Sequence, residues 1–292
     1  MGTYRNITLR GNAEYTIFIP DPLASLEIDT TSLAPLIGET EAALKQWDQS
    51  AETWTDGEIA AMQASEAEDS WMLSAGKYFS PFSLTFHANG LSQEERQEII
   101  HLTEACTYAV GALKELPLCG RLLRNAHYLM CRGPRYEKRY PGEFRSSPVW
   151  IGREGCTLKE ALFVPPAGEA MTEAFSELEK FIHADSGLHP LVRAALIHYQ
   201  FETIHPFIDA NGRVGRLLNT LFLLESGMIR QPALQWSNAL GRFGDRYCAA
   251  LQRVHETGSY EAWIGFFLLS LKEAAGRGPK TGSESTADEH QR

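Results

Sequence analysis

The sequence predicts a mostly helical protein with one small β-hairpin. Long segments repeat apolar residues close to the 3.6-residue period of an α-helix. Ser92 and Glu95 have the spacing of a capping box at the start of the longest such segment. Residues 133–166 break this pattern and are rich in Gly, Pro, Tyr and Arg. Hydrophobic residues make up 43% of the chain and charged residues 22%, which is an ordinary balance for a globular protein.

Four helices are expected in the first half of the chain, after an extended arm with proline punctuation at residues 17–29. Ser32 or Thr31 can cap the first helix, and the second is expected to begin near Asp56. The predicted helical segments are 30–49, 56–75, 91–116 and 119–132. Residues 133–166 are then predicted to form a long loop with a short hairpin around residues 144–151. A loop of this length in a compact domain is usually functional or disordered, and its aromatic residues favour an ordered, functional loop.

Helical periodicity returns in the second half of the chain. Gly227 suits a helix C-cap, because glycine accepts the left-handed conformation that ends many helices. The predicted segments are 169–184, 189–204, 212–227, 240–258 and 260–276. We divide the chain into an N-terminal helical region (1–90), a core that forms one compact unit with it (91–275) and a polar tail expected to be disordered (276–292).

Charge and composition exclude several classes of protein. The formal net charge of -10 argues against broad binding of a nucleic-acid backbone, which requires a basic face. No run of eighteen apolar residues predicts a membrane span. The polar N-terminus carries no evident signal peptide. The five cysteines are odd in number and never spaced as C-x-x-C, which favours buried thiols in a reducing cytoplasm over disulfides or a zinc cluster.

The stretch HPFIDANGRVGR, residues 205–216, concentrates polar residues at the start of an apolar helix. A helix beginning near Asn211 or Gly212 has free N–H groups and a positive dipole end, and the small residues Ala210 and Gly212 let an anion approach. Arg213 and Arg216 share one helix face and can clamp phosphate groups with their planar guanidinium forks.

A metal ligand and a base complete this set. Asp209 precedes the cradle, and a lone carboxylate beside phosphates is a common way to hold Mg²⁺. His205 ends the preceding helix and can accept a proton near neutral pH. The stretch therefore predicts transfer of a phosphate-containing group to a hydroxyl. The plainer reading makes His205 a helix C-cap and Asp209 a turn residue.

The stretch resembles the signature of the Fic family, H-P-F-x-[DE]-[GA]-N-G-R-x-x-R, and matches every defined position. The similarity continues in the proline-containing arm, in PGEFRSSPVWIG, which is similar to the family's flap, and in AALIHYQFETIHPF. It covers roughly residues 18–271. The resemblance implies the Fic fold, a helical bundle around a central helix pair that carries the motif, with a β-hairpin flap.

The resemblance also implies an activity, because most proteins with this motif are protein adenylyltransferases. They transfer AMP from ATP, with Mg²⁺, to a Ser, Thr or Tyr hydroxyl of a target protein. His205 would deprotonate the hydroxyl, and Asp209 would coordinate Mg²⁺ between the α- and β-phosphates. Asn211 and the backbone amides around Gly212 would hold the α-phosphate. Arg213 would bind the β-phosphate and Arg216 the γ-phosphate.

Two further segments have expected roles. The flap edge, comprising Ser147, Pro148, Val149, Trp150 and Ile151, would pair with an extended piece of the target, and GEFR would anchor its near end. Many relatives carry an inhibitory helix with the pattern [ST]-x-x-x-E-[GN], whose glutamate pairs with the second arginine of the signature. The nearest match assigns that place to Glu68, whereas another register puts Leu73 or Ser74 there.

Alternatives to AMP transfer remain at this point. Glycine at 212 favours the AMP-transferring nucleotide pose over the pose of a related kinase branch that has lysine there. A regulatory nucleotide-binding module with weak catalysis is one alternative, and a hydrolase that removes AMP is another. Relatives with this N-terminal region often dimerise, so a homodimer is compatible with the resemblance. The histidines His183, His189 and His198 are interpreted as structural.

Overall fold

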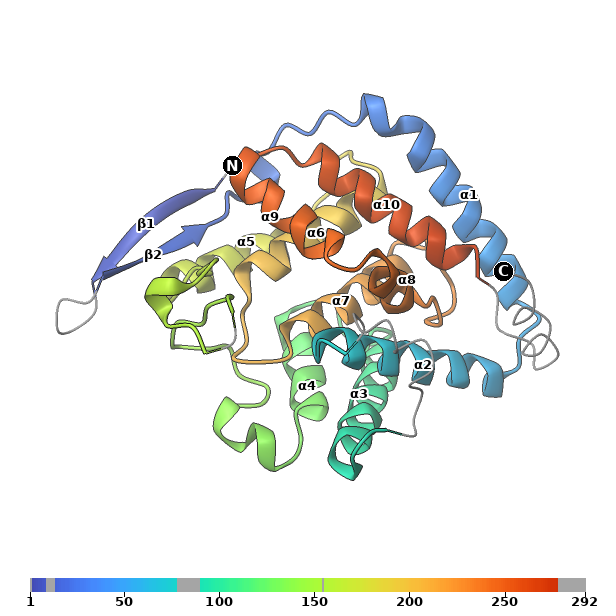
Figure 1. Ribbon diagram of the computed structural model, residues 1–292. Helices are drawn as coiled ribbons and strands as arrows, with labels where there is room; N and C mark the ends of the chain where they lie inside the picture. Colours follow the sequence, from blue (N-terminus) through green and yellow to red (C-terminus); the bar gives the residue numbers. More distant parts are fainter. Residues whose placement is uncertain (1, 9–13, 78–89, 154, 278–292) are drawn as a thin grey trace, which may run out of the picture.

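The computed structural model describes residues 2–8, 14–77, 90–153 and 155–277, and the fold is mostly helical, as predicted (Figure 1). The helices are α1 (Ala34–Ala51), α2 (Asp56–Ser74), α3 (Gln93–Ala112), α4 (Gly120–Met130), α5 (Glu169–His183), α6 (Pro190–Ile204), α7 (Asn211–Glu225), α8 (Trp236–Phe243), α9 (Arg246–Thr257) and α10 (Glu261–Ala275). Strands β1 (Thr3–Thr8) and β2 (Glu14–Ile19) pair antiparallel, with Thr3 opposite Ile19. The 3₁₀ segments include η4 (Pro134–Arg139). The expected tail lies almost entirely outside the described residues.

Helices α6 and α7 form the centre of the bundle. Helix α6 is buried around nearly its whole circumference, and most of its residues are apolar. Helices α10 and α9 cover one side of this pair, while α2, α3 and α4 lie on the other (Figure 1). Helix α1 packs along α10, so the N-terminal region and the core share one hydrophobic interior. No helix in the described parts of the chain is long and apolar enough to cross a membrane.

Two capping boxes set the starts of the helices that flank the motif. The Ser92 hydroxyl accepts a hydrogen bond from the Glu95 amide, and the Glu95 carboxylate accepts one from the Ser92 amide, as predicted. Helix α2 begins in the same way, with Thr55 and Glu58 as partners, one residue before the predicted cap at Asp56. Each box satisfies amides that would otherwise lack partners at a helix start.

The predicted hairpin around residues 144–151 is wrong. The two-stranded sheet of the described residues lies at the N-terminus, and Ile151 instead forms an isolated antiparallel bridge with Phe163. Pro148 has no N–H to donate, and the carbonyl of Ser147 accepts a hydrogen bond from the Arg145 side chain, so neither group is available to a strand partner. The sequence did not predict strand β1, because its residues are mostly exposed and do not alternate between apolar and polar.

The predicted helix 240–258 is two helices. Gly244 has a φ of 56°, a conformation that ends α8, and α9 begins two residues later. Helix α8 also begins earlier than predicted, at Trp236, which is buried and donates a hydrogen bond to Ser270 on α10. Gly227 ends α7 as expected, with a φ of 71°.

We expect stability to rise with pH between about 4 and 6.5. Buried histidines stay neutral in the fold while the unfolded chain takes up protons in this window, so acid favours unfolding. Glu66 and Glu202, whose pKa values burial raises to about 8 and about 7, act in the opposite sense above pH ~4.3 but are fewer. Urea unfolding midpoints across the window test this, and a midpoint that stays flat or falls would contradict it. Burial lowers the pKa of His127, His205 and His255 to about 4 and that of His198 to about 3.

Candidate active site

The sequence HPFIDANGRVGR folds as the predicted helix–loop–helix between α6 and α7. His205 ends α6 with a φ of 50°, and Ala210 precedes α7 with a φ of 63°. Such left-handed conformations are uncommon for residues with a side chain and cluster at functional sites. Asn211 holds the turn closed, because its Oδ1 accepts from the Phe207 amide and its Nδ2 donates to the Phe207 carbonyl, both at 2.9 Å. The side chain of Asn211 is thus committed to the loop, and its backbone N–H remains for an anion.

The His205 ring is oriented by the backbone of α6. Its Nδ1 lies 3.1 Å from the carbonyl oxygen of Glu202, and a nitrogen that faces a carbonyl must carry the hydrogen. Nε2 therefore holds the free lone pair. Burial lowers the pKa of His205 to about 4, so the ring is neutral at physiological pH and can accept a proton.

Arg145 binds the end of α6 to the flap. Its Nε donates to the His205 carbonyl at 2.6 Å, and its Nη2 donates to the carbonyls of Pro166 at 2.6 Å and Ile204 at 3.1 Å. Nη1 donates to the Ser147 carbonyl at 3.1 Å. The expectation that GEFR anchors the near end of the flap is thus confirmed by this buried guanidinium.

The N-terminus of α7 is open to an anion. The first intrahelical bond runs from Val214 N to the Ala210 carbonyl at 3.0 Å, so the amides of residues 211–213 have no acceptor within the helix. Ala210 offers no side-chain cap. A Cβ on Gly212 would lie 3.1 Å from Nη1 of Arg216 and 3.7 Å from Oγ of Ser74, so glycine keeps this approach clear.

Asp209 and Arg213 lie side by side in the cradle. Oδ1 of Asp209 accepts from the Ala210 amide at 2.6 Å and lies 3.5 Å from Nη2 of Arg213. Oδ2 is paired with Arg139 of η4. Arg213 also donates from Nη1 to the Tyr136 hydroxyl at 3.1 Å, while its buried Nε has no hydrogen-bond partner among the described residues.

Arg216 lies beneath α2 and hydrogen-bonds to two serines of that helix, while the inhibitory role of Glu68 stays a prediction. Its Nε donates to Oγ of Ser70 at 2.8 Å, and its Nη2 donates to the Ser70 carbonyl at 2.7 Å and to Oγ of Ser74 at 2.6 Å. Helix α2 therefore covers the second arginine of the motif, as an inhibitory helix would. Ser74 is the residue that the alternative register of the inhibitory pattern puts at the glutamate position, so a serine hydroxyl contacts Arg216 at that place.

A cavity of about 310 Å³ brings the motif residues together. Such a volume is in the range of small-molecule sites. A larger cavity of about 570 Å³, between α2, α3 and residues 230–232, contains no motif residue, so its size says nothing about the chemistry. The smaller cavity is lined by His205, Asp209, Ala210, Asn211, Gly212, Arg213 and Arg216, with Ser74, Arg135, Glu202, Tyr247 and others around them.

Glu202 and Gly215 form a tight contact behind the motif. Oε1 of Glu202 is buried without a hydrogen-bond partner among the described residues, and burial raises the pKa of this carboxyl to about 7. A Cβ on Gly215 would lie 2.2 Å from that oxygen. Gly215 is the second of the two unspecified positions before Arg216, and a side chain there would force the Glu202 carboxyl to move.

His127 is a site residue that sequence reasoning missed. Its Nδ1 accepts from the Gly142 amide at 2.8 Å, so Nε2 carries the hydrogen and donates to the Asp209 carbonyl at 3.2 Å. Its ring stacks on Phe207 with centroids 4.0 Å apart. This buried histidine fixes the backbone of Asp209 from α4. A lone histidine among apolar residues of α4 carries no spacing signal that could have revealed this contact.

A second missed group supports Arg213. Glu98 on α3 is buried and accepts from the Trp71 indole at 2.8 Å, the Tyr136 hydroxyl at 3.1 Å and Nη1 of Arg135 at 3.2 Å. Tyr136 in turn accepts from Arg213. The network links α2, α3 and η4 to the motif, so residues from three other parts of the chain position this guanidinium.

The flap edge is present without regular strand pairing. Trp150 and Ile151 are each 43% exposed, which leaves both available to a partner. The Trp150 indole donates to the Cys156 carbonyl at 3.0 Å, and Ile151 exchanges backbone hydrogen bonds with Phe163. The pairing of Ser147, Pro148, Val149, Trp150 and Ile151 with a target stays a prediction.

Comparison with known proteins identifies the family of this domain. The model of the Fic/DOC family matches residues 117–223. An 88-residue segment is 38% identical to a protein named "Protein adenylyltransferase Fic" from Drosophila yakuba and 35% identical to that of Drosophila melanogaster. The match covers 30% of this chain and spans only 16% of each fly protein's length. Residues 117–223 therefore form a Fic/DOC family domain.

Solved structures extend the similarity of fold over most of the chain. A Fic family protein from Desulfovibrio desulfuricans superposes with a TM-score of 0.65 at 23% identity, covering 86% of this chain and 74% of that one. Residues 134–508 of Fic-1 from C. elegans superpose with a TM-score of 0.54 at 18% identity, covering 85% and 73%. At these identities the likeness establishes the Fic fold, and the predicted fold class is confirmed.

We expect Arg145→Lys to destabilise the protein by about 2–4 kcal/mol, because an ammonium cannot reach all four carbonyls and buried acceptors lose their partners. Thermal or urea unfolding measures the loss. Arg153→Lys is the matched control, since Arg153 is exposed on the same segment. Equal stability of the two variants would contradict the anchoring role of Arg145.

Proposed function

We propose that this protein is an adenylyltransferase that moves AMP from ATP to a Ser, Thr or Tyr hydroxyl of a target protein. The observation that carries the proposal is the orientation of the His205 ring, with Nδ1 against the Glu202 carbonyl. Its Nδ1–H is held by the Glu202 carbonyl, and its free Nε2 belongs to a cavity shared with Asp209 and both motif arginines. The fly relatives named as adenylyltransferases support the same reaction class.

The proposed reaction needs one proton transfer and one displacement. Nε2 of His205 takes the proton of the target hydroxyl, and the hydroxyl oxygen forms a bond to the α-phosphorus of ATP. The bond between that phosphorus and the α,β-bridging oxygen breaks, and pyrophosphate leaves with the bond's electron pair. The open amides at the start of α7 are placed to stabilise charge on the α-phosphate.

The arginines suit the remaining phosphates. Arg213 is buried, and its Nε has no hydrogen-bond partner among the described residues, so this guanidinium has a donor in reserve for a ligand. Arg216 is held by neutral serine hydroxyls, which a phosphate can replace more readily than it could replace a carboxylate. Arg213 would contact the β-phosphate and Arg216 the γ-phosphate.

The residues present also fit Mg²⁺. Asp209 supplies a hard oxygen ligand at the edge of the anion cradle, and one carboxylate with substrate phosphates and water is the usual ligand set for Mg²⁺ in nucleotide sites. The described residues contain no cluster of three or more His, Cys, Asp or Glu that would suit another metal. Bound there, the ion would neutralise phosphate charge, and Asp209 would hold it in place.

Gly212 favours AMP transfer over phosphoryl transfer. A side chain at this position would press on Arg216 and narrow the cradle that takes the α-phosphate. The target would present its hydroxyl from an extended segment along the flap edge, close to His205, because Arg145 connects the two.

We expect His205→Ala to reduce labelling of target proteins from α-labelled ATP by about 10²-fold or more, because the base is lost. Wild type should transfer label from the α-position and none from the γ-position, measured with Mg²⁺ in cell lysate. His183→Ala, an exposed histidine on α5, should behave as wild type. Label from the γ-position alone would indicate a kinase, and absence of label from every variant would indicate a binding module.

Ser74→Glu should lower AMP transfer by about tenfold or more, because a carboxylate there pairs with Arg216 and opposes the γ-phosphate. Ala64→Glu adds the same charge at an exposed place on α2 and should have little effect. Glu68→Gly should leave transfer unchanged. Full activity of Ser74→Glu would show that α2 does not govern access to Arg216, and activation by Glu68→Gly would restore Glu68 as the inhibitor.

A further inference from the structure

Asp209 already has a cationic partner, Arg139, which lies outside the HPFIDANGRVGR motif. Arg139 is the last residue of η4, and its Nη1 pairs with Oδ2 of Asp209. The other carboxylate oxygen, Oδ1, accepts from the Ala210 amide and faces Arg213. The two oxygens therefore differ, because Oδ1 is bound within the motif while Oδ2 is held by a residue from another part of the chain.

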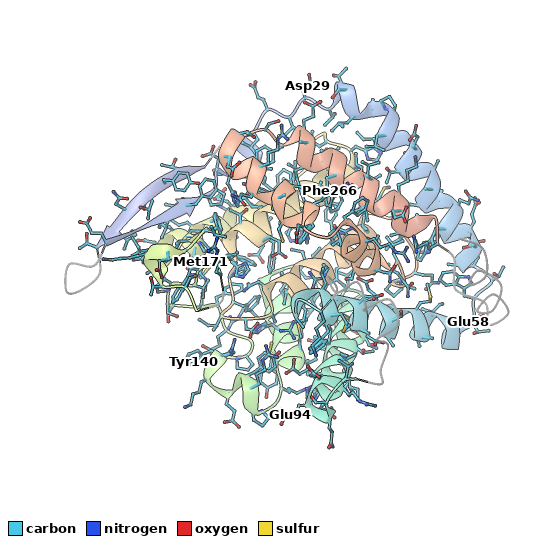
Figure 2. All side chains as sticks on the ribbon, viewed as in Figure 1. Asp29, Glu58, Glu94, Tyr140, Met171 and Phe266 are labelled. Atoms are coloured by element: carbon cyan, nitrogen blue, oxygen red, sulfur yellow. The ribbon has the colours of Figure 1, made fainter. Side chains whose placement is uncertain are left out.

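The backbone around Arg139 is fixed on both sides. Tyr136 is buried and bonded to Glu98, and the Gly142 amide is bonded to His127. Tyr140, between them, has a φ of 50°, is 65% exposed and lies at the periphery of the molecule in Figure 2. This anchoring places the start of the Arg139 side chain beside the motif and leaves its far end to move.

The side chain of Arg139 is exposed enough to release Asp209. It is 42% exposed, whereas that of Asp209 is 21% exposed and that of Arg213 only 4%. A partly exposed ion pair is weak, of the order of 1 kcal/mol, and can be exchanged for a stronger partner. Arg135, the other arginine of η4 near the cavity, is not an equivalent candidate, because its Nη1 contacts both oxygens of Glu98 at 3.2 and 3.3 Å.

A metal ion and Arg139 compete for the same oxygen. A divalent cation that enters beside the triphosphate needs a carboxylate oxygen that faces the cavity, and Oδ1 is already engaged. Without either cation, the negative charge of Asp209 would repel the phosphates. Either Arg139 or the ion can neutralise Oδ2, and the stronger field of a divalent ion favours it when nucleotide is present.

We propose that Arg139 is the resident counter-ion of Asp209, which neutralises the carboxylate before nucleotide binds and releases it to the metal ion that accompanies the nucleotide. The proposal rests on the proposed function, because it needs a nucleotide in this cavity. It assigns Arg139 a positioning role that makes binding of the nucleotide less dependent on the metal.

The test is a calorimetric cycle of nucleotide binding. The probe is the ATP analogue with a methylene group between the α- and β-phosphates, which cannot donate AMP. Its Kd is measured with EDTA and with saturating Mg²⁺. Arg139→Gln should weaken metal-free binding about fivefold and binding with Mg²⁺ by less than about twofold, because the ion takes over neutralisation. Arg139→Lys should recover part of the metal-free affinity.

Two controls separate a local pair from general charge. Lys138→Gln removes the same charge one residue away, from an exposed side chain, and should change neither Kd by more than about twofold. In an Asp209→Asn background there is no carboxylate to neutralise, so Arg139→Gln should have the same small effect with and without Mg²⁺.

The outcomes separate a failure of the Arg139 proposal from a failure of the proposed function. An equal loss of affinity with and without Mg²⁺ would make Arg139 a direct phosphate contact and overturn the proposal. Unchanged affinity in both conditions would overturn it as well. Both results leave the proposed function standing. Failure of the wild-type protein to bind the analogue with Mg²⁺ would instead contradict the proposed function, and this inference with it.

Discussion

The pair of hydrogen bonds between Asn211 and the backbone of Phe207 is the constraint on which the site depends. These bonds close the turn between α6 and α7, so that two residues with side chains, His205 and Ala210, can adopt left-handed conformations. Each such residue costs roughly 1–2 kcal/mol and persists only where the surroundings determine it. The closed turn aims the histidine ring and the helix N-terminus at one cavity.

The site then balances buried charge in two different ways. Arg145 is surrounded by backbone carbonyls, which solvate its charge without a counter-ion. Arg213 and Arg216 rest on a phenol and on serine hydroxyls, so the motif brings more positive than negative charge to the cavity. The two motif arginines can attract a polyanion to a cavity that Asp209 and Glu202 also line, while the negative charge of the whole protein disfavours extended nucleic acids.

Local sequence predicted the parts of the structure that depend on local physics. The helical period located the helices, the Ser92–Glu95 spacing located the start of α3, and the motif located the turn and its histidine. The contact between Arg216 and α2 was anticipated only through the family resemblance, because Ser70 and Ser74 lie more than 140 positions away and local periodicity does not connect them to Arg216. The same reason hid His127, whose role appears only when α4 lies against the loop. The flap hairpin was predicted from composition. Composition does not reveal that the Arg145 side chain hydrogen-bonds to the Ser147 carbonyl, which a strand partner would need.

The close contact of Gly215 with Glu202 has a consequence for how this chain can change. The general motif leaves position 215 unspecified, yet here a methyl group would collide with a buried carboxyl oxygen. Residues 202 and 215 are therefore coupled, because a larger residue on α7 requires the Glu202 side chain either to move or to be replaced by a shorter one. Replacing both residues would also remove a buried oxygen, Oε1 of Glu202, that has no hydrogen-bond partner among the described residues. A position that the motif leaves unspecified can therefore still be restricted in one particular protein by the residue that packs against it.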